Sequence, residues 1–385
     1  MLKSRLAHHL KLKYPIIQAP CAPYSLEPLV AAVSNAGGLG SLSAALQSPD
    51  KIRNSIREIK RLTDKPFAVN LFAPQFPQPT PDDFTNKQRY PSDDILDNFR
   101  KELGAPCPER YTPRSFPFED QLNVVLEERC PVLSFTFGQL PDGAIAKLKQ
   151  AGIYVIGTAT TVHEAKILVY TQNDQDAVDA IIAQGSEIIN CLQAGGHRGK
   201  LRDTKIESQL GTMSLLPQVV DAVGAKVPVL AAGGISDARS LYASFILGAD
   251  AACLGTLFML TKETTLPDYH RNALLSASPD ATQLTRAFTG RYARGITNRF
   301  MDTMHNSCLK EEDIPEYDIY SARTMDILAK AKADGKADEY CNMWAGQSFG
   351  VGREFTNNGT LSAAETIQKL VAGVENLSKQ SFTQQ

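Results

Sequence analysis

The feature that most constrains the fold is an alternation of short apolar runs with helical patterns, from Tyr14 to about residue 256. The runs are continuously apolar, which is typical of parallel strands covered on both faces. They span residues 14–19, 38–42, 66–71, 132–135, 153–157, 177–183, 227–231 and 251–254. Eight strand–helix units predict an α/β TIM barrel. The competing open sheet would carry a GxGxxG turn after its first strand, and this chain has none there.

Two regions fall outside this alternation. Residues 76–118 are rich in proline, with a helical pattern near 93–103, and we interpret them as an insertion after the third strand. A lid and a simple surface elaboration both fit this insertion. Beyond residue 257 the pattern is helical, ending in a helix over 362–377. The expected units are a barrel over 1–75 and 130–300, an inserted lid-like segment over 76–129, and a helical C-terminal part over 301–385.

Composition excludes several classes of function. The net charge of −2 gives no basic excess, so we expect no nucleic-acid partner. No apolar run reaches the roughly 18 residues of a membrane span. The seven cysteines are scattered and form no CxxC pair, which argues against a disulfide framework and a zinc site. A reduced, cytoplasmic location and no bound metal are the expectations.

A pair of glycine turns is the strongest local signal. AAGGIS at 231–236 and CLGT at 253–256 follow the seventh and eighth expected strands. Gly233 and Gly234 let the backbone approach a ligand, and Gly255 and Thr256 do the same from the neighbouring strand. Loops seven and eight form the recurrent phosphate site of TIM barrels. The chain lacks a P-loop lysine, so a flavin or sugar phosphate fits better than ATP.

Two further motifs follow expected strands. AGGHRGK at 194–200 places His197 behind two glycines, where a neutral imidazole can take a proton and a flat ring can lie on the backbone. Arg198 beside it is either an attractor for an anionic substrate or a solvated neighbour. Asn70, at the end of the third run, offers an amide to a heterocycle or caps its loop.

Six segments together resemble a known family. They are YPIIQAP at 14–20, VAAVSNAGGLGS at 30–41, PFAVNLFAP at 66–74, AGGHRG at 194–199, AAGGISD at 231–237 and AFTGRYARGITNRFM at 287–301. The ordered set is similar to the class I nitronate monooxygenases, formerly called 2-nitropropane dioxygenases. The resemblance runs from about residue 5 to WAGQ at 344–347 and the final helix.

This resemblance implies an FMN-containing barrel that oxidises alkyl nitronates, such as propionate 3-nitronate, with O₂ to a carbonyl compound and nitrite. His197 would be the catalytic residue, acting as a base on neutral nitroalkanes. The residues implied to hold FMN are Pro20, Cys21, Ala22, Asn70, Gln184, Gly195, Gly196, Gly233, Gly234, Cys253, Leu254, Gly255 and Thr256. The implied partners are the small-molecule nitronate and O₂, and the chain would be a monomer or homodimer.

Three positions depart from the family pattern. Cys21, Ala22 and Pro23 stand where methionine and then glycine usually follow IQAP, and Thr136 replaces a frequent histidine. Residues 188–193, IINCLQ, interrupt the usual QGxEAGGH. This insertion is either a loop bulge or a strand slip that substitutes Gln193 for Gln184. Alternative functions are a flavin-dependent enoyl-ACP reductase, an NADH-dependent flavin reductase, or an FMN binder that the insertion has inactivated.

Overall fold

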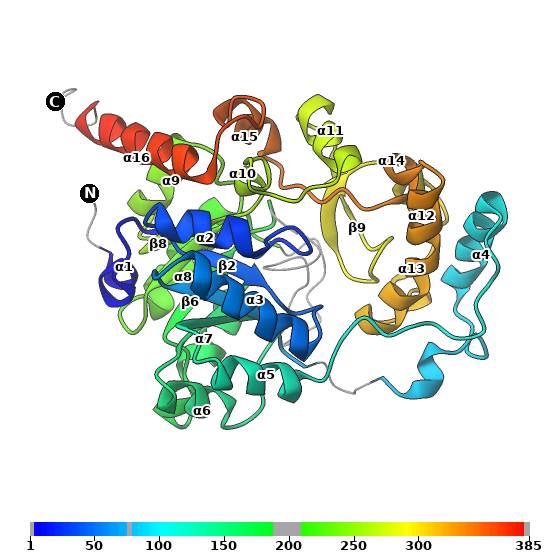
Figure 1. The fold of residues 1–385 in the computed structure, drawn as a ribbon, viewed down its shortest axis with the longest axis horizontal. Helices are drawn as coiled ribbons and strands as arrows, with labels where there is room; N and C mark the ends of the chain where they lie inside the picture. Colours follow the sequence, from blue (N-terminus) through cyan, green and yellow to red (C-terminus); the bar gives the residue numbers. More distant parts are fainter. Residues whose placement is uncertain (1–3, 75–78, 188–208, 381–385) are drawn as a thin grey trace.

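Eight parallel strands form a barrel, which confirms the TIM-barrel prediction (Figure 1). The computed structural model describes residues 4–74, 79–187 and 209–380. The strands are β1 (Ile16–Gln18), β2 (Gly40–Ser43), β3 (Phe67–Phe72), β4 (Val132–Thr136), β5 (Tyr154–Ala159), β6 (Ala180–Gln184), β7 (Val229–Ala232) and β8 (Ala251–Leu254). Their order is β1-β8-β7-β6-β5-β4-β3-β2. A parallel bridge between Ile17 and Leu39 joins β1 to β2 and closes the ring.

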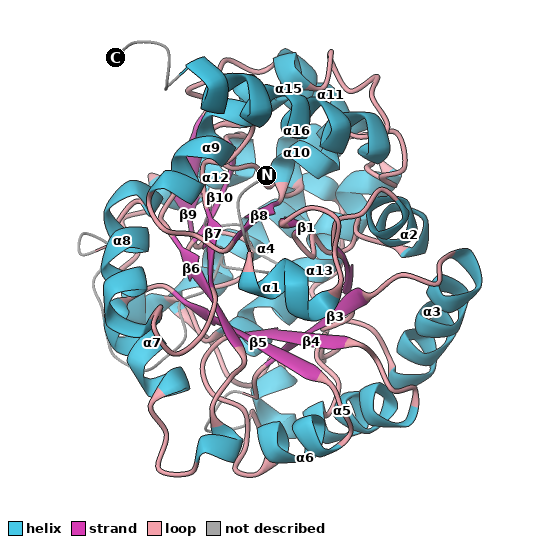
Figure 2. Cartoon of the chain, turned by 90° about the vertical axis from the view of Figure 1, so that its left-hand side faces the viewer, coloured by secondary structure: helices cyan, strands magenta, loops and turns pink. Residues whose placement is uncertain are grey.

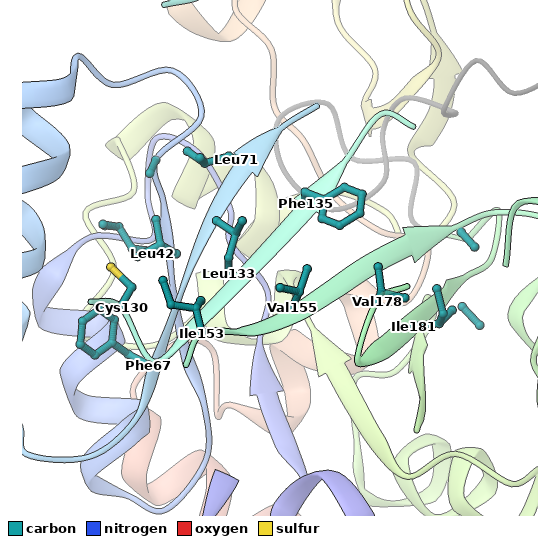
Figure 3. Packing of buried hydrophobic residues seen from close by; sticks show 14 of the residues in the cluster. Leu42, Phe67, Leu71, Cys130, Leu133, Phe135, Ile153, Val155, Val178 and Ile181 are labelled. Carbon is teal, nitrogen blue, oxygen red and sulfur yellow. The ribbon is translucent and has the colours of Figure 1, made fainter. Parts of the chain in front are cut away.

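Both faces of the strands are apolar, which explains the continuous runs in the sequence. Alternate residues such as Leu71, Leu133 and Ile181 pack outward against the helices (Figure 3). The residues between them, such as Ala68 and Ile182, belong to a second cluster inside the barrel. Every second residue of each strand therefore points into the barrel.

Helices surround the barrel, and α1 lies across the end where the strands begin (Figure 2). The helices of this part are α1 (Arg5–Leu10), α2 (Glu27–Asn35), α3 (Pro49–Leu62), α5 (Phe118–Glu127), α6 (Ala144–Gln150), α7 (Val162–Val169), α8 (Thr212–Val223), α9 (Ala238–Ile246), α10 (Thr256–Met259) and α16 (Ala363–Gln380). Side-chain caps set four of the starts, and Ser4 caps α1 by accepting from Ala7 N. Ser48, Thr161 and Asp237 accept hydrogen bonds from backbone N–H groups of α3, α7 and α9.

The proline-rich insertion and the C-terminal part share a core of their own beside the barrel (Figure 1). Its helices are α4 (Pro91–Leu103), α12 (Arg299–His305), α13 (Tyr317–Ala333) and α14 (Ala337–Tyr340). α15 (Phe349–Phe355) packs against α10 and α11 (Asp268–Ser276), and α11 packs against α14. The stretch from 79 to 117 leaves the barrel, meets α13, and returns to α5, which packs on α3 and β3.

A β-hairpin interrupts the C-terminal region, where the sequence pattern predicted only helices. β9 (Thr282–Thr285) and β10 (Ala293–Ile296) pair in antiparallel fashion. β10 is hydrogen-bonded in turn to the segment around Trp344. Strands this short carry too little periodicity to be distinguished from a helix by pattern, so that part of the prediction was wrong. Within the three described ranges, no helix is long and apolar enough to cross a bilayer.

Candidate active site at the barrel mouth

Polar side chains line the inside of the barrel where β2 to β5 end. Ser43, Asn70, Thr136 and Thr158 share the inward face with apolar residues below them. Asn70 Nδ2 donates to Ser134 Oγ at 3.0 Å. The Asn70 Oδ1 atom and the hydroxyls of the other three are buried, with no hydrogen-bond partner in the described part of the chain. A buried polar atom without a partner costs about 1–3 kcal/mol, so such a ring indicates a polar ligand.

The loop after β1 presents small, neutral groups to this mouth. Cys21 N donates to Ser25 Oγ at 2.7 Å, and Gln18 Nε2 donates to the same oxygen at 2.8 Å. Burial raises the pKa of the Cys21 thiol to about 12 and also raises the pKa of Cys253. Both thiols are therefore neutral packing groups and not nucleophiles. Pro20 and Ala22, on either side of Cys21, are also buried.

The two glycine turns lie on neighbouring strands, as the sequence predicted. Gly233 and Gly234 have φ of +122° and +68°, a backbone that only glycine adopts readily. Gly255 has an ordinary φ of −99°, which other residues also adopt. A glycine is useful at this position because it leaves space, and not because the backbone conformation requires it. A Cβ there would lie 3.4 Å from Cys21 Sγ. The Leu254 side chain packs outward into the core, which leaves only its backbone near the mouth.

The end of β6 resolves one alternative left open by the sequence. Gln184 is the last residue of β6 and pairs with Ala232 of β7. The strand has therefore not slipped to replace Gln184. His197, Gly195 and Gly196 lie outside the described residues, and their placement stays a prediction.

A carboxylate that the sequence did not single out lies beside the glycine turns. Glu187 accepts from Thr212 N at 2.8 Å and from Thr212 Oγ1 at 2.9 Å. Ser186 N also donates to Leu210 O at 2.9 Å. These contacts tie together the two chain segments that flank residues 188–208. The Glu187 side chain occupies the start of α8 and also lies against Gly233, so its negative charge disfavours a phosphate at that helix and next to that glycine.

The segment 346–348 covers the glycine turns from above. Gly346 N donates to Thr256 Oγ1 at 3.0 Å, and Ser348 Oγ donates to Gly234 O at 3.1 Å. Gln347 N donates to Glu187 O at 3.0 Å. In the sequence, the WAGQ motif at 344–347 marked this segment as part of the family resemblance. The motif did not indicate which loops the segment contacts.

An aromatic cavity of about 540 Å³ opens on the opposite side of the mouth. β3 and β4 lie four positions from β7 and β8 in the closed ring. Phe72 ends β3, and Phe137 follows β4 with its ring 4.3 Å from that of Phe72. The insertion and α13 complete the aromatic lining with Phe84, Tyr111, Phe116 and Tyr317. The charged lining groups are Arg110, Glu119 and Asp318, and burial raises the pKa of Asp318.

Comparison with known proteins decides the family. The sequence model described as nitronate monooxygenase matches residues 3–373. The chain belongs to the nitronate monooxygenase family. Family membership makes the chain a flavin-dependent oxidoreductase.

Individual relatives agree with this assignment. A probable nitronate monooxygenase of Staphylococcus aureus (strain MSSA476) is 38% identical over 347 residues, covering 90% of this chain and 92% of that protein. The structure of nitroalkane oxidase from Streptomyces ansochromogenes has a TM-score of 0.80 at 32% identity, covering 97% of this chain and 99% of that one. FabK from Thermotoga maritima has a TM-score of 0.73 at 24% identity over the whole of both chains, a likeness of fold alone.

Proposed function

We propose that the protein is an FMN-dependent nitronate monooxygenase of the cytoplasm. It would oxidise alkyl nitronates such as propionate 3-nitronate with O₂ to a carbonyl compound and nitrite. The observation that carries this proposal is the ring of buried polar atoms at the mouth, from Ser43 to Thr158, that have no hydrogen-bond partner among the described residues. It faces the paired glycine turns across the barrel, so one elongated ligand with a polar ring and a phosphate satisfies both sides.

The residues fit FMN at each end. Gly255 leaves space for a phosphate at the end of β8, and Thr256 offers a hydroxyl there. Thr212 and Glu187 fill the space beside Gly233, so the phosphate would bind on the Gly255 side of the two turns, within reach of the Gly234 backbone. Asn70 and Gln184 offer amide groups to the polar edge of a flavin ring, and Pro20, Cys21 and Ala22 offer an apolar wall. When bound, the flavin would supply the oxidation of the nitronate and the reaction with O₂.

The chain's own groups prepare the substrate. His197 would take a proton from the carbon of a neutral nitroalkane, whereas a nitronate has already lost that proton. With nitronates the imidazole would orient the substrate and balance its charge. The aromatic cavity would receive the substituent, since it begins at Phe72 and Phe137 beside the polar ring.

An assay without NADH tests this proposal. Purified protein reconstituted with FMN is mixed with propionate 3-nitronate, and nitrite release and oxygen uptake are followed. Nitrite formation with oxygen consumption is the expected result. NADH-dependent reduction of the flavin without nitrite would favour the enoyl reductase or flavin reductase alternative. Bound flavin with no turnover under either condition would identify an inactivated flavin binder.

A further inference from the structure

Arg294, in β10, is a buried cation with poor internal compensation. Its residue is only 9% exposed. Nη1 donates to Thr282 O at 3.3 Å and to Thr282 Oγ1 at 3.4 Å, both long contacts. Its Nε atom is buried and has no hydrogen-bond partner in the described ranges. Across those same ranges no carboxylate comes within ion-pair distance of the Arg294 guanidinium.

Two other buried arginines of this chain each have a carboxylate partner. Arg323 lies 3.0 Å from Asp93, and Arg100 lies 2.7 Å from Asp326. Arg294 has no such partner, and burial lowers its pKa. A guanidinium stays protonated even so, because its ordinary pKa exceeds 12. The site therefore carries a desolvated positive charge that an anionic ligand would compensate.

The backbone contacts place Arg294 at the barrel mouth. Ala345 N donates to Arg294 O at 3.2 Å, and the next residue, Gly346, donates to Thr256 Oγ1. Among the described residues, Glu187, beside Gly234, is the acidic group whose charge raises the Arg294 pKa. The side chain also lines a separate cavity of about 580 Å³ along the β9–β10 hairpin, which shares no lining residue with the described part of the mouth and whose other ionisable groups are Arg286, Tyr292, His305, Lys310 and Glu311. The balance of charge in this cavity is positive.

We propose that Arg294 is the counter-cation for an oxyanion bound at the barrel mouth. Resting on the proposed function, this inference allows two sources of the oxyanion: the phosphate of the flavin, or the nitronate group of the substrate. Arg294 would act through its positive charge and through a charge-assisted hydrogen bond, because its Nε–H is available to donate to an oxygen of the ligand. Neither the spacing of the sequence motifs nor the glycine turns pointed to this residue.

The first arm of the test measures cofactor binding to the apoprotein. Dissociation constants for FMN and riboflavin are measured by flavin fluorescence for the wild type, Arg294→Gln, Arg294→Lys and Arg286→Gln. Arg286 lines the same cavity but already donates to Gly290 O and Glu311 O, so its variant is the matched control. If the flavin phosphate is the partner, Arg294→Gln weakens FMN binding roughly 10- to 100-fold and leaves riboflavin binding unchanged. Arg294→Lys recovers part of the loss.

The second arm measures substrate binding by the FMN-loaded protein. If the nitronate is the partner, Arg294→Gln raises KM for the nitronate about tenfold or more, with little change in kcat and in KM for the neutral nitroalkane. Unchanged values in both arms, relative to Arg286→Gln, would overturn the inference. A wild-type apoprotein that binds neither flavin would instead refute the proposed function.

Thermal melting of the apoprotein tests whether Arg294 has a merely structural role. Arg294→Met removes the buried charge and keeps most of the volume. We expect its apoprotein to melt at the wild-type temperature or above, because no internal ion pair is lost. A large fall in the melting temperature of the apoprotein would show that Arg294 holds the fold together, and the inference would fail.

Discussion

Arg323 Nη1 lies 3.0 Å from Asp93 Oδ2, and both side chains are completely buried. Arg323 Nη2 also donates to the carbonyls of Asp83, Thr85 and Gln88. One residue of α13 thus fixes both the loop before α4 and α4 itself. If the insertion moves over the mouth as a lid, this part of it must move together with α13.

The Arg323–Asp93 pair should contribute strongly to stability. Arg323→Ala leaves the Asp93 carboxylate buried without its partner, so we expect a loss of about 3–5 kcal/mol in the free energy of unfolding. Arg89→Ala is the control, because Arg89 pairs with Asp94 and Asp97 near the surface, and its loss should cost about 1 kcal/mol. Urea denaturation measures both. Similar small losses of unfolding free energy in both variants would show that the buried Arg323–Asp93 pair contributes little to stability.

The buried Thr136 hydroxyl should lower the stability of the apoprotein and strengthen flavin binding. This hydroxyl has no partner among the described residues, so Thr136→Val should stabilise the apoprotein by up to about 1 kcal/mol. The same change should weaken flavin binding. Thr324→Val is the matched control, since Thr324 Oγ1 is buried but donates to Phe288 O at 2.9 Å, and its loss should destabilise by about 1 kcal/mol. Equal destabilisation by both variants would contradict a ligand-facing Thr136.

Gly255 should be needed for space in the cofactor site. At φ −99°, an alanine adopts this backbone without strain, and its methyl group would meet only Cys21 and Ala19 at 3.4–3.6 Å. We therefore expect Gly255→Ala to fold normally and to bind FMN at least about tenfold more weakly. Gly352→Ala, which also has room for a methyl group, should leave binding unchanged. Normal FMN affinity of the Gly255 variant would place the phosphate elsewhere.

His270 should make stability depend on pH. It is fully buried between Tyr24 OH and Trp344 O, and burial lowers its pKa from 6.5 to about 4. The unfolded chain therefore binds a proton more readily, so stability falls as the pH drops from about 6.5 towards 4, by about 3 kcal/mol in total. Unfolding free energies across this range test the slope. His270→Gln should flatten it, and an unchanged slope would assign the effect to other groups.

Phe116 should influence substrate choice. It lines the aromatic cavity while 39% exposed, so Phe116→Ala should not disturb a packed core. If the cavity holds the substituent, kcat/KM should fall about tenfold for a hexyl nitronate and little for ethyl nitronate. Ile246→Ala, at an exposed position on α9, controls for general effects. A uniform loss across chain lengths would exclude Phe116 from the substrate site.

Local pattern predicted the barrel but not the contacts that join distant segments. Seven of the barrel strands begin within two residues of the expected positions and β6 three residues later, because parallel strands bury both faces and read as apolar blocks. The hairpin was missed because β9 and β10 have four residues each, and β10 pairs on its other side with a segment near Trp344. Pairing at that distance leaves no periodic trace in the sequence.

The site shows the same division. Gly233, Gly255 and Asn70 could be predicted as site residues because strand ends and glycine turns mark them locally, and the structure places all three at strand ends; their role in binding stays a prediction. Arg294 and Glu187 could not be predicted, since an arginine in ARG or a glutamate after a strand reads as an ordinary surface residue. Their character depends on burial and on neighbours far along the chain, such as Thr282, Thr212 and Ala345.

The contacts of Ser186 with Leu210 and of Glu187 with Thr212 have an evolutionary consequence. They close the base of the β6–α8 connection independently of how many residues lie between. We therefore expect a change in the length of this connection to leave the register of β6 unaltered. We also expect that a shorter connection from a relative could be grafted onto this barrel between those four residues.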